Sequence, residues 1–152
     1  DDAAAQIQVI SKPLRKQGRR QGFGLTAPER KAVELCAMAR TEEWLKKGGY
    51  SVEDTHEDQP YDFLAKKDGR QLFIEVKGTI SDICDSIVMT KNEVELHRTR
   101  KGSTALFLVS QIQLQKNEDP PKAIGGFLEE HIGWDIDSWH NVPIAFQVSK
   151  RT

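Results

Sequence analysis

The sequence predicts an α/β fold in which helices flank a mixed sheet. Three features of the 152-residue chain indicate this fold: two helices that each begin with a capping box, two strand-like segments joined by an Asp-Gly turn, and an unbroken apolar run after the second helix. The hydrophobic content of 38% and the charged content of 30% are typical of a globular protein, and the length fits one domain.

The first helix is predicted over "TAPERKAVELCAMARTEEWLKKGG", residues 26 to 49. Thr26 and Glu29 form its capping box, and Pro28 lies in its first turn, where a missing N–H costs nothing. Gly48 is the expected stop.

Residues 1 to 25 carry glycines and a proline that remove any periodicity, so we expect a flexible basic lead-in or linker there and a folded domain over residues 26 to 152. The stretch "SKPLRKQGRR" holds five basic residues and no acid. Such runs are more often solvated linkers than binding arms, but Arg19 and Arg20 are candidate phosphate contacts. The start "DDAAAQ" lacks a methionine and suggests a piece of a longer polypeptide.

Strands are predicted next, at "YSVEDT" (50–55), "YDFLA" (61–65) and "QLFIEVKGT" (71–79). Asp68 and Gly69 between the last two are the strongest short hairpin signal. A further short strand is expected at "SIVMT", residues 86 to 90.

Thr90 and Glu93 form a second capping box, which opens a helix over about residues 91 to 100. The run "TALFLVSQIQLQ" that follows predicts a strand covered on both faces. The tail is expected to add one short helix and a last strand near residues 143 to 149. The order is therefore helix, three strands, helix and strand, with a C-terminal extension.

The two-residue turn fixes the register of the hairpin, because Lys67 must then lie opposite Arg70. The same register places Asp62 directly across from Glu75, with Cβ atoms about 5 Å apart. Lys77 falls on the face of Glu75, whereas Val76 belongs to the apolar stripe on the other face, together with Leu72 and Ile74. Two facing carboxylates repel, so we expect a positive charge between them.

Glu34 lies within the apolar arc of the first helix, where an acid is rare unless it is paired or coordinated. We therefore expect Glu34 to point toward the same site. Carboxylates around a small gap suit Mg²⁺, which activates water and offsets charge in phosphodiester hydrolysis. Each of these residues taken singly fits a cross-strand ion-pair ladder or a paired surface acid equally well.

An Asp before the hairpin and "EVK" after it resemble the signature of the PD-(D/E)XK nuclease superfamily, with Tyr61 in place of the proline. More narrowly, residues 21 to 149 resemble the C-terminal domain family of the plant protein NO VEIN, which also occurs in bacterial defence and restriction proteins. The matching blocks are "ERKAVELCAM", "GYSVEDT", "PYDF", "FIEVKGT", "MTKNEVE" and "ALFLVSQI". The resemblance implies a restriction-endonuclease-like αβββαβ core. It also implies that Asp62, Glu75 and Val76 bind Mg²⁺ (or Mn²⁺), that Asp62, Glu75 and Lys77 are catalytic, and that Glu34 is an accessory acid.

Weaker candidates for nucleic-acid contact are Lys91 and Asn92 at the start of the second helix and Gln111 on the following strand. Cys36 and Cys84 are too few for a disulfide framework or a zinc site, which favours reduced thiols and a cytoplasmic location. The sequence has no apolar run that would span a bilayer, so no membrane partner is expected.

The resulting hypothesis is a Mg²⁺-dependent DNA endonuclease domain, the cutting module of a restriction or anti-phage defence system. DNA is the expected partner, with further domains or subunits such as an ATPase or helicase, and with a homodimer as one way to cut two strands. Two alternatives stay open: a nucleic-acid-binding module of the same fold that does not cut, and a protein-interaction domain whose acidic cluster is structural.

Overall fold

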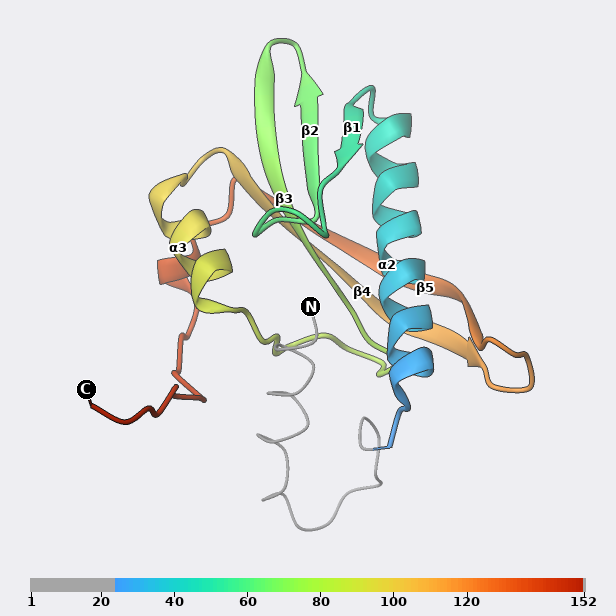
Figure 1. Cartoon of the computed structure of the whole chain (residues 1–152). Helices are drawn as coiled ribbons and strands as arrows, with labels where there is room; N and C mark the ends of the chain where they lie inside the picture. The colour runs from blue at the N-terminus through green and yellow to red at the C-terminus, as the bar shows by residue number, and fades with distance from the viewer. Residues whose placement is uncertain (1–23, 152) are drawn as a thin grey trace.

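The computed structural model describes residues 24–151, which form a five-stranded sheet with helices on both faces (Figure 1). The strand order is β1-β2-β3-β4-β5; β3 and β4 are parallel and the other neighbours are antiparallel. The elements are α2 (Ala27–Lys47), β1 (Ser51–Asp54), β2 (Phe63–Lys67), β3 (Arg70–Gly78), α3 (Lys91–Thr99), β4 (Thr104–Gln115), β5 (Lys122–Ile132) and the short 3₁₀ helix η1 (Ile136–Ser138).

The predicted α/β class, the mixed sheet and the α-β-β-β-α-β order are confirmed. Both capping boxes form: the Thr26 hydroxyl accepts from the Glu29 N–H at 3.2 Å, and Thr90 accepts from Glu93 at 3.3 Å. No helix within residues 24–151 is long and apolar enough to cross a membrane.

The two helices cover opposite faces of the sheet. The apolar side of α2, which includes Val33, Ala37 and Leu45, packs against Ile74 and Val76 of β3 and their neighbours on β4. The other face carries Leu106 and Leu108, which pack with residues of α3, η1 and the preceding loop: Met89, Val94, Trp134 and Ile136. Because side chains alternate along a strand, Glu75 and Lys77 lie on the α3 side.

β3 ends where it passes close to α2. A Cβ at Gly78 would lie 2.7 Å from the Cβ of Ala37 and 3.3 Å from the Val33 carbonyl oxygen. Only glycine lets the strand and the helix approach this closely. This close packing fixes the position of the C-terminal half of β3, and therefore of Lys77, relative to α2.

The strand predicted over residues 86–90 is wrong. This segment has no regular structure; it leads from β3 into α3, and Ile87 and Met89 pack against the apolar cluster under α3. Its apolar alternation reflects that packing. The parallel pairing of β3 with β4 leaves no free edge at this place for another strand.

The prediction for the tail is also wrong. Residues 143–149 form no strand, and the expected helix is reduced to η1. Instead, Lys122–Ile132 form β5. The glycine pair Gly125-Gly126 interrupts the alternation of apolar residues by which a strand is predicted from sequence. Gly126 has φ +104, and a Cβ there would lie 2.6 Å from Val109, so the glycine fits β5 against β4.

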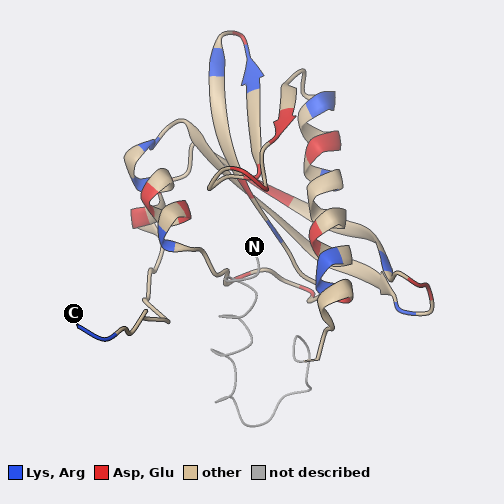
Figure 2. Ribbon diagram, viewed as in Figure 1, with Lys and Arg blue, Asp and Glu red and all other residues tan. Residues whose placement is uncertain are grey.

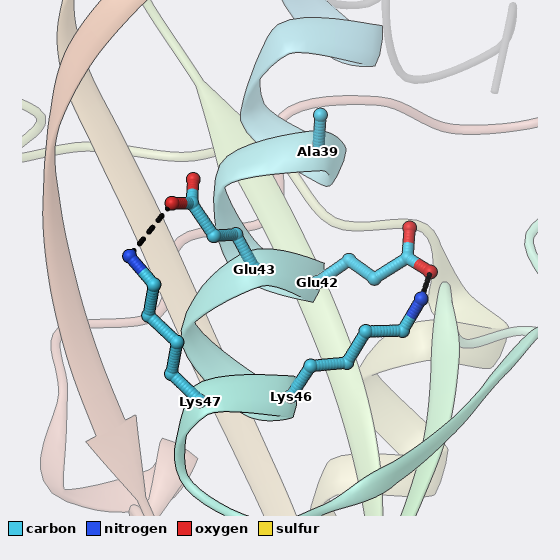
Figure 3. Close-up of a pocket in the computed structure, with 5 residues that line it drawn as sticks. All are labelled: Ala39, Glu42, Glu43, Lys46 and Lys47. Carbon is cyan, nitrogen blue, oxygen red and sulfur yellow. Dashed lines mark hydrogen bonds and ion pairs between the residues drawn. The ribbon is translucent and has the colours of Figure 1, made fainter.

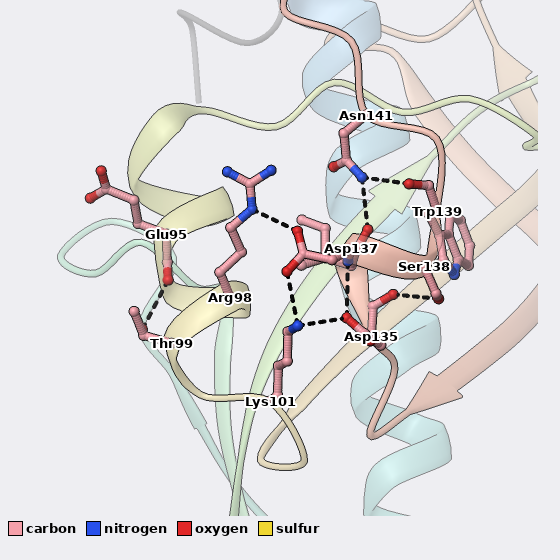
Figure 4. A network of polar contacts seen from close by, with 10 residues as sticks. Glu95, Arg98, Thr99, Lys101, Asp135, Asp137, Ser138, Trp139 and Asn141 are labelled. Atoms are coloured by element: carbon pink, nitrogen blue, oxygen red, sulfur yellow. Dashed lines mark hydrogen bonds and ion pairs between the residues drawn. The ribbon is translucent and has the colours of Figure 1, made fainter.

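The segment after β5 is tied to α3 by surface ion pairs (Figure 4). Arg98 Nε donates to Asp137 at 2.9 Å, and Lys101 Nζ lies 3.1 Å from Asp135 and 2.8 Å from Asp137. Below them, Trp134 Nε1 donates to the buried His97 at 2.9 Å. The extension therefore completes the core on the α3 side.

Candidate active site

The β2–β3 hairpin positions the first carboxylate. Asp68 and Gly69 have φ of 50° and 75°, as a type I′ turn requires, and Lys67 pairs with Arg70 as predicted. The ladder ends with Phe63 opposite Ile74, and Asp62 lies just outside this last pair. The Asp62 N–H donates to the Ile74 carbonyl at 2.7 Å, which keeps the residue tied to β3.

The Asp62 side chain closes the end of the ladder. Its Oδ2 accepts the Val76 N–H at 2.8 Å, at a point where β2 has no backbone group to offer. The Phe73 N–H donates to Ser103, just before β4, and the Thr79 N–H donates to Val109 of β4, so by alternation the Val76 N–H and C=O point to the β2 side. The Val76 carbonyl therefore lies beside Asp62, beyond the end of β2.

Glu75 and Lys77 lie side by side on the α3 face of β3. Lys77 Nζ is 3.0 Å from Glu75 Oε1, and the two side chains are 15% and 4% exposed. Two charged groups this deeply buried indicate a built site, because long charged side chains otherwise remain in water.

A third acid, Glu93 of α3, completes the arrangement. Its Oε1 lies 3.2 Å from Lys77 Nζ, and its Oε2 accepts from the Thr90 N–H at 2.9 Å and from the Thr90 hydroxyl at 2.6 Å. The sequence identified Glu93 only as a helix-capping residue. The signal for its second role was topological: the helix between two parallel strands must return across one face of the sheet, which brings its first turn near the end of β3.

The site holds three acids, Asp62, Glu75 and Glu93, around one amine. Burial raises the pKa of Asp62, against the opposing effect of the Val76 N–H. Burial also raises the pKa of Glu75 well above its ordinary value, and the nearby acids add to this shift.

The pKa of Glu93 moves the other way. Burial alone would raise it, but the Lys77 ammonium and the hydrogen bonds from Thr90 lower the pKa of Glu93 to about 2. Burial would likewise lower the pKa of Lys77, yet Glu75 and Glu93 outweigh burial and raise it. The Lys77 ammonium is therefore shared by Glu75 and Glu93, whose pKa values shift in opposite directions within one cluster.

This donor set suits a hard cation. Asp62, Glu75 and the Val76 carbonyl offer oxygen ligands, and ionisation of all three acids leaves an excess of negative charge beside Lys77. Within residues 24–151, no group of three or more His, Cys, Asp or Glu side chains is already arranged to hold a metal. Lys77 instead bridges Glu75 and Glu93.

Glu34 is not in contact with these residues. It is half-buried on α2, on the other face of the sheet, and its Oε1 lies 3.6 Å from Lys31. The negative charge of Glu34 nevertheless acts on the site, because it contributes to the raised pKa of Asp62.

The weaker candidates lie at the edge of the site or away from it. Lys91 and Asn92 are exposed at the start of α3, next to the capping residues, and Lys91 is 3.8 Å from Glu95. Gln111, with φ +57, donates its side-chain amide to the Asp82 carbonyl at 3.3 Å, beyond the end of β3. Arg19 and Arg20 lie outside the described residues.

A surface pocket on the exposed side of α2 is unrelated to the carboxylates (Figure 3). It is lined by the ion pairs Glu42–Lys46 at 2.7 Å and Glu43–Lys47 at 2.8 Å. Such i,i+4 pairs are ordinary features of a solvated helix surface.

One family model matches residues 33–124, which include all three acids and Lys77: protein NO VEIN, C-terminal. The chain belongs to this family. No curated protein and no solved structure matches it. The NO VEIN C-terminal match spans the chain from α2 into β5 and therefore covers the whole of the candidate site.

Proposed function

We propose that the chain is a Mg²⁺-dependent DNA endonuclease domain of the PD-(D/E)XK type, acting as the cutting module of a restriction or anti-phage defence system. The observation that carries the proposal is the hairpin site: Asp62 bonded to the Val76 N–H, and Lys77 two residues beyond Glu75 on the same strand, 3.0 Å from it. Buried acids in excess of buried cations cost folding free energy. Such clusters are typical of sites that bind a ligand or carry out a reaction.

Each residue has a role that its position supports. Asp62, Glu75 and the Val76 carbonyl would hold Mg²⁺, which supplies an activated water and neutralises charge on the phosphate. The Lys77 ammonium, charged and largely shielded from water, is placed to stabilise the negative charge that develops on the phosphodiester. Glu93, with Oε1 3.2 Å from the ammonium, helps Glu75 to orient it.

Other functions of the system would belong to other parts of it. The proposed partners are DNA, further domains or subunits such as an ATPase or helicase, and a second copy of the chain for cleavage of both strands. A nucleic-acid-binding module that does not cut is the second candidate. The bridging position of Lys77 between Glu75 and Glu93 favours it, because this ion pair satisfies the amine without a metal.

Plasmid nicking tests the proposal. We expect the purified chain to convert supercoiled plasmid to nicked circles with Mg²⁺ or Mn²⁺ and to stop when EDTA is added. Asp62→Ala should lose the activity, because it removes a metal ligand and exposes the Val76 N–H. Equal nicking by both proteins would point to a contaminating nuclease, and binding of DNA without nicking would establish the second candidate.

A further inference from the structure

The face of the hairpin that carries the site continues beyond it toward the turn. Side chains of paired residues share a face, so this surface, the site face, is formed by alternate residues of both strands: Asp62, Leu64, Lys66, Gln71, Phe73, Glu75 and Lys77. The acids lie at one end of the site face, and Lys66 lies near the other.

Helix α3 runs along the site face in the direction opposite to β3. Glu93 contacts Lys77, and seven residues later the Arg100 guanidinium lies 4.8 Å from the centre of the Phe73 ring. Seven helical residues span about 10 Å, and the four residues from Lys77 back to Phe73 span about 13 Å. The helix and the strand therefore cover similar distances between their two contacts. Arg100 is therefore held over the site face by the Phe73 ring, which also packs edge-to-face with Tyr61 at 5.0 Å between ring centres.

Lys66 and Arg100 are exposed cations with no carboxylate partner within residues 24–151. Their neighbours differ: Arg98 and Lys101 are neutralised by Asp135 and Asp137 (Figure 4). Figure 2 shows basic segments near the tip of the hairpin and toward the two ends of α3, with acidic segments between them on α3. Two unneutralised cations in line with an active site provide charge for an anionic ligand.

The spacing identifies the ligand as an extended polyanion. Phe73, under Arg100, lies about 7 Å from Glu75 along the strand, and Gln71, opposite Lys66, lies about 13 Å from it. A small anion would need cations that converge on one point. A row of cations leading away from a phosphodiester-cutting site fits a nucleic-acid backbone.

We propose that DNA leaving the cleavage point runs along the site face toward the hairpin turn, with Arg100 and Lys66 contacting successive parts of its phosphate backbone. This inference rests on the proposed function and adds the direction in which the DNA lies. It also distinguishes the two faces of the hairpin. Arg70, opposite Lys67, lies on the face that α2 covers and is not expected to contact the DNA.

Fluorescence anisotropy with a labelled DNA duplex tests the inference on the whole chain. Ca²⁺ replaces Mg²⁺, and electrophoresis verifies that the duplex stays intact. Lys66→Gln and Arg100→Gln are each expected to lower the slope of log affinity against log salt by about 0.9, and to weaken binding at low salt by about tenfold. Arg70→Gln removes an exposed charge from the same turn on the opposite face and should leave the slope unchanged.

Equal slopes for the three variants and the parent, or a drop with Arg70→Gln as large as with Lys66→Gln, would overturn the inference, as would absence of DNA binding by the parent chain. Thermal unfolding of Arg100→Gln shows whether loss of the Phe73 contact disturbs the fold; Lys66→Gln tests the path independently. Selective slope changes without nicking would support the path while rejecting the nuclease. Nicking with unchanged slopes would reject only the path.

Discussion

Replacing Lys77 by methionine is expected to lower kcat for DNA nicking on the order of a hundred- to a thousand-fold, the usual loss when one stabilising group of a transition state is removed. The ammonium is only 15% exposed and lies 3.0 Å from Glu75, so it acts in a site with little water to replace it. KM for DNA should change little, because the buried amine offers little surface to the ground-state duplex.

The measurement is steady-state nicking of Lys77→Met beside Lys47→Met. Lys47 is an exposed lysine on α2 whose partner is Glu43, and its replacement should leave the rate unchanged. Thermal unfolding of both variants verifies the fold, since Glu75 and Glu93 lose their shared cation in Lys77→Met. A normal kcat with a raised KM would make Lys77 a phosphate contact instead of a catalytic group.

Replacing Glu75 by glutamine is expected to abolish nicking and, without metal at pH 8, to raise the free energy of unfolding, because a neutral side chain has no buried charge to desolvate. Glu75 is 3% exposed, and its pKa is raised by burial and by the nearby acids, so its ionised form destabilises the native state. Glutamine keeps the shape without the charge, and Lys77 retains Glu93 as its partner. Stability rises and function falls together, as at many active sites.

The pH dependence gives the sign of this effect. An acid whose pKa is raised on folding stabilises the native state most when it is protonated, so the contribution of Glu75 falls as pH rises above 4.5 through its folded pKa. Glu93 acts oppositely: its lowered pKa gives stability that is present above 4.5 and is lost as pH falls toward about 2.

Chemical denaturation across this range measures both effects. The unfolding free energy of the parent chain should decline from pH 5 to pH 8, and Glu75→Gln should flatten that decline while keeping the loss at acid pH. A parallel decline in both proteins would mean that Glu75 does not hold the raised pKa.

The parts of the fold that depend on neighbouring residues in the sequence could be predicted from it. Asp68 and Gly69 fix the hairpin through their own backbone angles, and that register extends to Phe63 opposite Ile74, next to Asp62. The capping boxes likewise involve residues three apart, Thr26 with Glu29 and Thr90 with Glu93. Local chemistry decided each of these features.

The errors concern features that distant contacts decide. β5 contains a glycine pair that breaks the apolar alternation, yet Gly126 is required by its fit against Val109. Glu93 reaches Lys77 only because α3 crosses back over the sheet, which no spacing in the sequence reveals. Glu34 makes its ion pair with Lys31, yet its charge contributes to the raised pKa of Asp62, so its accessory role stays a prediction.

Calorimetric titration with Mn²⁺ tests most directly whether these buried acids form a metal site. We expect saturable binding to the parent chain that disappears in Asp62→Asn, which keeps an oxygen acceptor for the Val76 N–H but loses the charge. Identical titrations of the two proteins, or no saturable binding to the parent at a pH where Glu75 is ionised, would contradict it.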